Sequence, residues 1–105
     1  MAKNKPESRV LRACLDYLRL RGHFVFRVNC GAFKTDRGGY FKSTDIPGVS
    51  DIIGIAKDGR GLAVECKSDK GKLSELQKAF GEKYREAGGV FIVARSVEDL
   101  QEAGL

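Results

Sequence analysis

Cysteine and histidine, the usual ligands of zinc, are scarce in this chain and stand far apart. The three cysteines, Cys14, Cys30 and Cys66, form no CxxC pair, and the single histidine is His23. Zinc sites draw on closely spaced clusters of these residues, and a disulfide framework needs an even set of cysteines. The sequence therefore argues against both, and we interpret the cysteines as small buried hydrophobic residues.

Long hydrophobic runs are also absent. No apolar run approaches the roughly 20 residues that a membrane-spanning helix needs, and the opening MAKNKPESRV has no apolar segment typical of a signal peptide. We therefore expect a cytoplasmic protein without a membrane role. At 105 residues with 42% hydrophobic composition, the chain has room for a modest core, so residues 1–105 are predicted to form one domain.

The net charge is the first feature that bears on a binding partner. Nineteen Lys and Arg residues against fourteen Asp and Glu give a net charge of +5. A basic balance favours a polyanionic partner such as nucleic acid, but many small basic proteins bind none. The charge alone leaves that choice open.

Hydrophobic periodicity and turn signals predict an α/β fold. Val10, Leu11, Cys14, Leu15 and Leu18 recur at helical spacing, Ser74 and Gln77 match a capping box, and Asp58-Gly59 separates two apolar runs as in a hairpin. Helices are predicted over 6–21, 75–87 and 97–103, and strands over 23–29, 51–56, 61–67 and 90–94. The order α-β-β-β-α-β-α predicts one mixed sheet with helices on both faces, and strands 51–56 and 61–67, apolar on both faces, should be covered above and below.

The segment 30–48, CGAFKTDRGGYFKSTDIPG, is the least regular part of the chain. Its glycines, aromatic residues and the cations Lys34, Arg37 and Lys42 suit a loop that contacts phosphates and exposed bases of a nucleic acid. The alternative is a plain surface loop, or a short hairpin around Gly38-Gly39, with aromatic residues that cap the core. The sequence leaves both open.

The stretch 47–77 carries the candidate chemistry. Asp51 opens one predicted strand, while Glu65 and Lys67 close the next and point to the same face because they are two residues apart. If these strands pair, two carboxylates and an ammonium meet at one end of the sheet, a site suited to Mg²⁺ or Mn²⁺ with the Cys66 carbonyl as a further ligand. Lys67 could then stabilise charge on a phosphate. The alternative is a solvated strand end where Glu65 and Lys67 simply pair.

In their order along the chain, these motifs resemble those of a known nuclease superfamily. PGxxD over 47–51, ExK over 65–67 and Gln77 early in the next helix resemble the PD-(D/E)xK nucleases, and more closely the virus-type replication-repair nuclease (VRR-NUC) family. The resemblance covers most of the chain. One departure is Ser50, which stands where proline is common; because Asp51 is retained, we expect an altered turn rather than lost chemistry.

The resemblance assigns roles to individual residues. It implies that Asp51 and Glu65 are the metal-binding carboxylates, with the Cys66 carbonyl as a further ligand, and that Lys67 is the catalytic lysine.

Two further residues have both an implied role and an ordinary one. Gln77 matches a glutamine that borders the catalytic site, but it may only close the capping box. Glu7 matches an acidic residue of the first helix that can approach the metal, but it may only serve the helix dipole.

The implied activity is that of an Mg²⁺- or Mn²⁺-dependent DNA endonuclease. Stand-alone members of the family resemble Holliday-junction resolvases of bacteria and phages, so the resemblance implies a homodimer acting on branched DNA. Two alternatives are a catalytically silent DNA-binding module on the same fold and a nuclease that cuts linear duplex. The basic residues expected to contact the DNA backbone are Lys34, Arg37, Lys42, Lys70 and Lys72.

Overall fold

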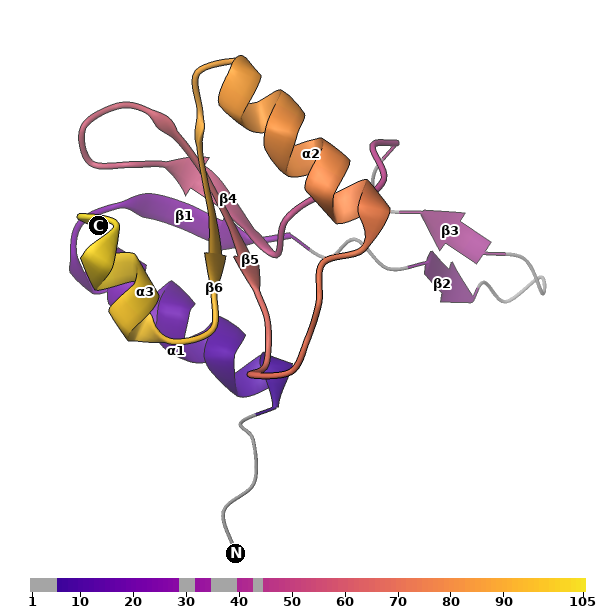
Figure 1. The fold of residues 1–105 in the computed structure, drawn as a ribbon, viewed down its shortest axis with the longest axis horizontal. Coiled ribbons are helices and arrows are strands. Elements are labelled where there is room, and N and C mark those ends of the chain that lie inside the picture. Colours follow the sequence, from indigo (N-terminus) through magenta and orange to yellow (C-terminus); the bar gives the residue numbers. More distant parts are fainter. Residues whose placement is uncertain (1–5, 29–31, 35–39, 43–44) are drawn as a thin grey trace, which may run out of the picture.

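The computed structural model describes residues 6–28, 32–34, 40–42 and 45–105, and it has a mixed α/β fold (Figure 1). The predicted fold class and the predicted order of helices and strands are confirmed, with one added hairpin between the first two predicted strands. The elements are α1 (Glu7–Leu20), β1 (Phe24–Arg27), β2 (Ala32–Lys34), β3 (Tyr40–Lys42), β4 (Ile52–Ile55), β5 (Gly61–Cys66), α2 (Glu75–Glu86), β6 (Val90–Ala94) and α3 (Val97–Glu102).

The main sheet has four strands in the order β1-β4-β5-β6. β4 is antiparallel to both β1 and β5, whereas β6 is parallel to β5. A parallel connection needs a crossover, and α2 provides it. β4 and β5 therefore form the centre of the sheet.

β2 and β3 form a separate antiparallel hairpin within the irregular segment 30–48, apart from the main sheet (Figure 1). Ala32 pairs with Lys42 and Lys34 with Tyr40 along the backbone. The short hairpin considered for this segment is therefore present in its backbone. The proposed hairpin centre, Gly38-Gly39, lies outside the described residues.

One face of the main sheet packs on α1 and α3. The predicted apolar stripe of α1 is buried against the sheet residues Val25, Ile52, Leu62 and Val64. Cys14 and Cys66 are free and fully buried within this core, as expected of small hydrophobic residues. Along the described parts of the chain, no helix has the length and apolar character to span a bilayer.

The opposite face is covered by α2 over only half of its width. Phe80 of α2 stacks on Tyr84 and meets Phe91 of β6 edge-on, with ring centroids 5.6 and 6.4 Å apart. Phe24 of β1 and Ile55 of β4 pair on this face, beyond the reach of α2, and are 76% and 53% exposed. The prediction of cover on both faces is right for β5 and wrong for the end of β4, because α2 follows the β5–β6 crossover.

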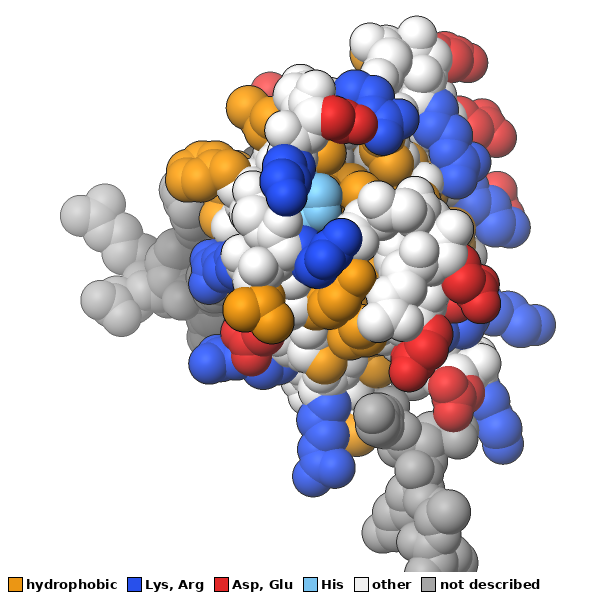
Figure 2. All heavy atoms as spheres, turned by 90° about the vertical axis from the view of Figure 1, so that its left-hand side faces the viewer, with side chains coloured by type: hydrophobic (Ala, Val, Ile, Leu, Met, Phe, Trp, Pro, Cys, Tyr) orange, Lys and Arg blue, Asp and Glu red, His pale blue; other side chains and the backbone are white. Residues whose placement is uncertain are grey.

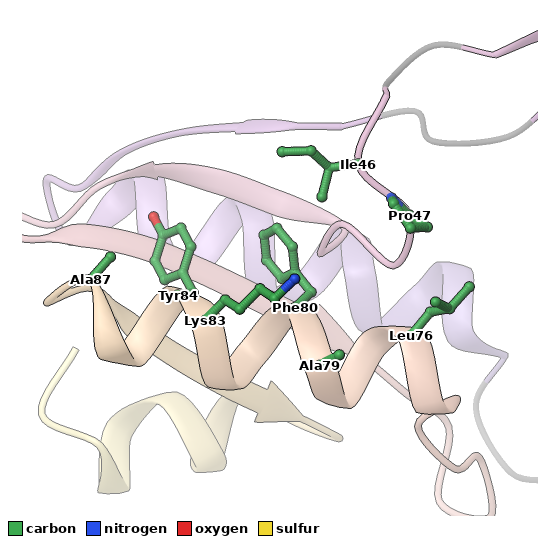
Figure 3. A pocket seen from close by; sticks show the side chains of 8 residues that line it. All are labelled: Ile46, Pro47, Leu76, Ala79, Phe80, Lys83, Tyr84 and Ala87. Carbon is green, nitrogen blue, oxygen red and sulfur yellow. The ribbon is translucent and has the colours of Figure 1, made fainter.

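An apolar groove of about 300 Å³ marks the border of this covered half (Figure 3). Ile46 and Pro47 form one wall, and the exposed side of α2 forms the other with Leu76, Phe80 and Tyr84. The segment that leads to Asp51 therefore runs beside α2.

Gly81 sets how closely α2 approaches the sheet. It is the one buried residue of α2, and a Cβ atom placed there would lie 2.4 Å from the Phe91 ring. Gly-to-Ala changes inside helices usually stabilise by about 1 kcal/mol, but here the added methyl overpacks the core. We expect Gly81→Ala to lower the free energy of unfolding by about 1–3 kcal/mol in urea denaturation. Lys78→Ala, at an exposed position of the same helix, serves as control; equal or higher stability for Gly81→Ala would contradict this packing.

Candidate active site

Asp51 contacts the end of β5, beyond the point where β5 pairs with β4. The β4–β5 ladder ends at the pair Ile52–Val64, so Glu65 and Cys66 have no β4 partner. The Cys66 N–H instead donates to Asp51 Oδ2 over 2.8 Å. Because buried backbone donors require a partner, this bond fixes the Asp51 carboxylate at the end of β5. The predicted convergence of Asp51 and Glu65 is what the structure shows.

Glu65 is a buried carboxylate with one oxygen satisfied and one free. It is 2% exposed, and its Oε1 accepts a hydrogen bond from Gln77 Nε2 over 3.0 Å. Its Oε2 is buried without a hydrogen-bond partner among the described residues. A carboxylate oxygen in this state is costly unless another group satisfies it.

The surroundings of Glu65 raise the pKa of its carboxyl group. Burial, and then the charge of the adjacent Asp51 carboxylate, raise the pKa of Glu65 to about 8, while Lys67 acts in the opposite direction and Glu7 adds a smaller rise. Two carboxylates that share a dry site cannot both ionise cheaply unless a cation joins them.

Lys67 lies between two carboxylates and is itself buried. Its Nζ is 3.9 Å from Glu65 Oε1 and 3.8 Å from Glu7 Oε1, which is contributed by the first residue of α1. The start of α1 thus places Glu7 against the end of β5. The alternative predicted a simple Glu65–Lys67 pair at a solvated strand end. The pair is present, but both side chains are buried and Asp51 lies beside them.

Gln77 closes the predicted capping box and also contacts Glu65. Its side-chain oxygen accepts the Ser74 N–H and its own N–H donates to the Ser74 hydroxyl, which completes the predicted capping box. The amide nitrogen remains available and donates to Glu65. A single glutamine therefore connects the start of α2 to the buried carboxylate.

The turn before Asp51 packs closely against the first residues of α2. Gly48 has a φ of +77°, and a Cβ atom there would lie 2.3 Å from the Leu76 carbonyl oxygen, so no other residue fits. Ser50, in the position where proline was expected, is fully buried, and its hydroxyl has no hydrogen-bond partner among the described residues. Asp51 nevertheless reaches the end of β5, and the expectation that the chemistry survives this departure stays a prediction.

The carboxylate pair fits a hard divalent cation. Among the described residues, no three His, Cys, Asp or Glu side chains are grouped closely enough to hold a metal ion. Mg²⁺, however, usually binds one or two carboxylates and keeps several waters, and the free Glu65 Oε2 beside Asp51 is an oxygen donor of the right kind. Glu7 contacts Lys67, so a role for Glu7 at a metal stays a prediction.

The predicted DNA contacts lie in two different places. Lys70 and Lys72 are exposed on the loop between β5 and α2, directly after Lys67. Lys34 and Lys42 belong to the β2–β3 hairpin, and Arg37 lies outside the described residues. Lys70 and Lys72 flank Gly71, where a Cβ atom would lie 3.4 Å from Lys67 Cδ, so this pair lies near Lys67.

Arg95 is a positioning residue that sequence reasoning missed. It follows β6, and its guanidinium donates to the backbone carbonyls of Ser68 and Asp69. It thus ties down the loop that follows Lys67. No local motif signals this contact, because the two segments are 27 residues apart and meet only through the parallel pairing of β5 with β6.

A mixed sheet that carries a buried glutamate and a buried lysine at one strand end, with an aspartate beside them, defines a core of the PD-(D/E)xK nuclease class. Residues 7–98 match the model of the VRR-NUC domain, and the chain belongs to the VRR-NUC family of nucleases. Family membership indicates a nuclease that binds DNA. Neither the curated proteins nor the solved structures contain a match to the chain.

Proposed function

We propose that this protein is an Mg²⁺- or Mn²⁺-dependent endonuclease that cuts branched DNA, such as Holliday junctions, as a homodimer. The observation that supports metal dependence is the buried Glu65 carboxylate beside Asp51, because its Oε2 has no hydrogen-bond partner among the described residues. Branch selectivity and the homodimer follow from the resemblance, and two sites related by a two-fold axis suit a symmetric junction.

Each residue of the candidate site has a separate role in this proposal. Asp51, Glu65 and the Cys66 carbonyl would hold the metal, which when bound polarises a phosphodiester oxygen and lowers the pKa of bound water. Lys67 places a fixed positive charge beside Glu65 for the developing charge on the phosphate. Gln77 keeps the Glu65 carboxylate in one orientation through its 3.0 Å hydrogen bond.

Glu7 and the basic residues take supporting roles. Glu7, 3.8 Å from Lys67 Nζ, would orient the ammonium and come near the metal. Lys70 and Lys72 would contact the DNA backbone next to the cut, and Lys34, Arg37 and Lys42 would contact it elsewhere. Each phosphate that is neutralised should add roughly one unit to the log–log salt dependence of binding.

The decisive experiment compares a four-way junction with a linear duplex of the same sequence, each with Mg²⁺, Mn²⁺ or EDTA. We expect cleavage of the junction with either metal, weaker cleavage of the duplex, and none in EDTA. Binding without cleavage of any DNA would favour a silent DNA-binding module, and equal cutting of both substrates would favour a linear-duplex nuclease.

Calorimetric titration with Mn²⁺ tests the metal site separately from catalysis. Wild type should bind Mn²⁺, and Glu65→Ala should weaken that binding at least about tenfold because one of two carboxylates is lost. Glu75→Ala, at an exposed position of α2, is the matched control. Equal affinity in wild type and Glu65→Ala would refute this assignment.

A further inference from the structure

A second group of charged residues lies at the opposite end of the main sheet from Asp51 and Glu65. The α1–β1 turn contributes Arg21 and His23, and the β4–β5 turn contributes Lys57, Asp58 and Arg60, around a hollow of about 240 Å³. Figure 2 shows the single histidine, in pale blue, with Lys or Arg side chains on both sides of it. β5 spans six residues between the two ends, about 20 Å at the rise of a strand.

Specific contacts hold the two turns together. The Lys57 N–H donates to His23 Nδ1 over 2.8 Å. The Lys57 side chain passes across Gly22, where a Cβ atom would lie 3.6 Å from Lys57 Cδ. Arg21, His23 and Lys57 are therefore brought into one neighbourhood by folding, although the two turns are more than thirty residues apart.

Two of the three cations in the hollow, whose lining Gly104 and Leu105 complete, have no ion-pair partner among the described residues. Asp58 pairs with Arg60, whose guanidinium it meets at 2.7 Å. Within the described ranges, neither Arg21 nor Lys57 forms an ion pair with a carboxylate. The two unpaired cations thus create a local attraction for anions.

His23 adds a hydrogen-bond donor to this charge. Because its Nδ1 accepts from Lys57, the neutral ring carries its hydrogen on Nε2. Burial, and then the charges of Arg21 and Lys57, lower the pKa of His23, against a smaller opposing effect of Asp58. These surroundings favour the neutral ring.

We propose that this hollow binds a phosphate group, either in the backbone of a DNA arm or as free phosphate. Two unpaired cations and an N–H donor are the groups that phosphate oxygens require. The hollow is smaller than typical sites for drug-sized ligands, roughly 300–1,000 Å³, which suits one phosphate rather than a whole nucleotide. The claim that the bound phosphate belongs to DNA rests on the proposed nuclease function. The claim that the hollow binds phosphate does not depend on that function.

His23 provides a direct test because it is the only histidine, so its Hε1 signal in NMR is unambiguous. Inorganic phosphate is titrated into the full chain at pH 7 in EDTA, with NaCl at matched ionic strength as reference. We expect a saturable shift of this signal with phosphate alone, and binding about tenfold weaker in Arg21→Gln and in Lys57→Gln. Both side chains are exposed, so both variants should fold.

Arg12→Gln is the matched control, since it removes one exposed positive charge elsewhere, from the Arg12–Asp16 pair of α1. It should bind phosphate like wild type. A shift no larger than that caused by NaCl, or equal weakening in Arg12→Gln and Arg21→Gln, would overturn the proposal.

DNA binding in EDTA separates the two sources of phosphate and requires no cleavage. For a four-way junction, the log–log salt slope of the Arg21→Gln/Lys57→Gln double variant should be shallower than that of Arg12→Gln by about one unit. An unchanged slope together with a positive phosphate titration would overturn the DNA source and support free phosphate. If the nuclease proposal fails but the NMR shift is saturable, the phosphate site stands.

Discussion

Replacing Lys67 by alanine is expected to lower the rate of DNA cleavage by about 10²–10³-fold or more. The ammonium lies 3.9 Å from Glu65 Oε1 and is buried, so neither solvent nor another side chain can readily substitute for its charge. The measurement is single-turnover cleavage of a labelled four-way junction at saturating protein with Mg²⁺.

The control for this substitution is Lys78→Ala, which removes an exposed lysine of α2 that pairs with Glu75. This control should cleave at the wild-type rate. Junction binding in EDTA should be within about threefold of wild type in both variants, because one buried lysine contributes little to the overall DNA-binding charge. Cleavage by Lys67→Ala at the rate of Lys78→Ala would remove Lys67 from the proposed mechanism.

Glu65→Gln is expected to abolish cleavage and, in EDTA, to stabilise the fold by about 1–3 kcal/mol at pH 8. Glutamine has the same shape, and its side-chain oxygen can still accept from Gln77, but it removes a buried charge next to Asp51. Its amide can in addition donate to the Asp51 carboxylate. Urea denaturation of wild type and variant measures the difference.

The pH dependence of that difference has a definite sign. The pKa of Glu65 is raised from 4.5 to about 8 in the fold, so the folded chain keeps a proton that the unfolded chain releases. The stability due to this proton is complete below about pH 4.5 and is lost as the pH rises towards 8. In EDTA, the advantage of Glu65→Gln over wild type should therefore grow between pH 5 and pH 8.

The control is Glu75→Gln, whose side chain is 91% exposed and whose stability difference from wild type should stay nearly constant over this range. Mn²⁺ should raise the unfolding temperature of wild type at pH 8 and leave that of Glu65→Gln nearly unchanged. A Glu65→Gln variant that is less stable than wild type at pH 8 in EDTA would contradict this account of the buried carboxylate.

Together the two substitutions separate catalysis from stability at one site. In the proposed mechanism Lys67 supplies charge for the reaction, and its loss leaves Glu65 with less compensation. Glu65 is held in a conformation that is costly without a cation, as is common where function requires a buried charge. The candidate active site is thus a source of local instability that the core beneath α1 offsets.

The sequence alone determined the features that depend on neighbours along the chain. The stripe on α1 follows from 3.6-residue periodicity, the Ser74–Gln77 box from a spacing of three, and the β4–β5 hairpin from Asp58-Gly59. The α/β class and the meeting of Asp51 with Glu65 follow in turn, because a hairpin joins the start of one strand to the end of the next. Each of these features depends only on the local geometry of the chain.

Only the tertiary structure decided how these features act on one another. It showed that Gln77 reaches Glu65 as well as Ser74, that Glu7 approaches Lys67, and that α2 covers only half of its face of the sheet. Burial, desolvation and contacts between distant segments depend on the packing of the whole chain, which no local pattern encodes. The raised pKa of Glu65 is a consequence of that packing.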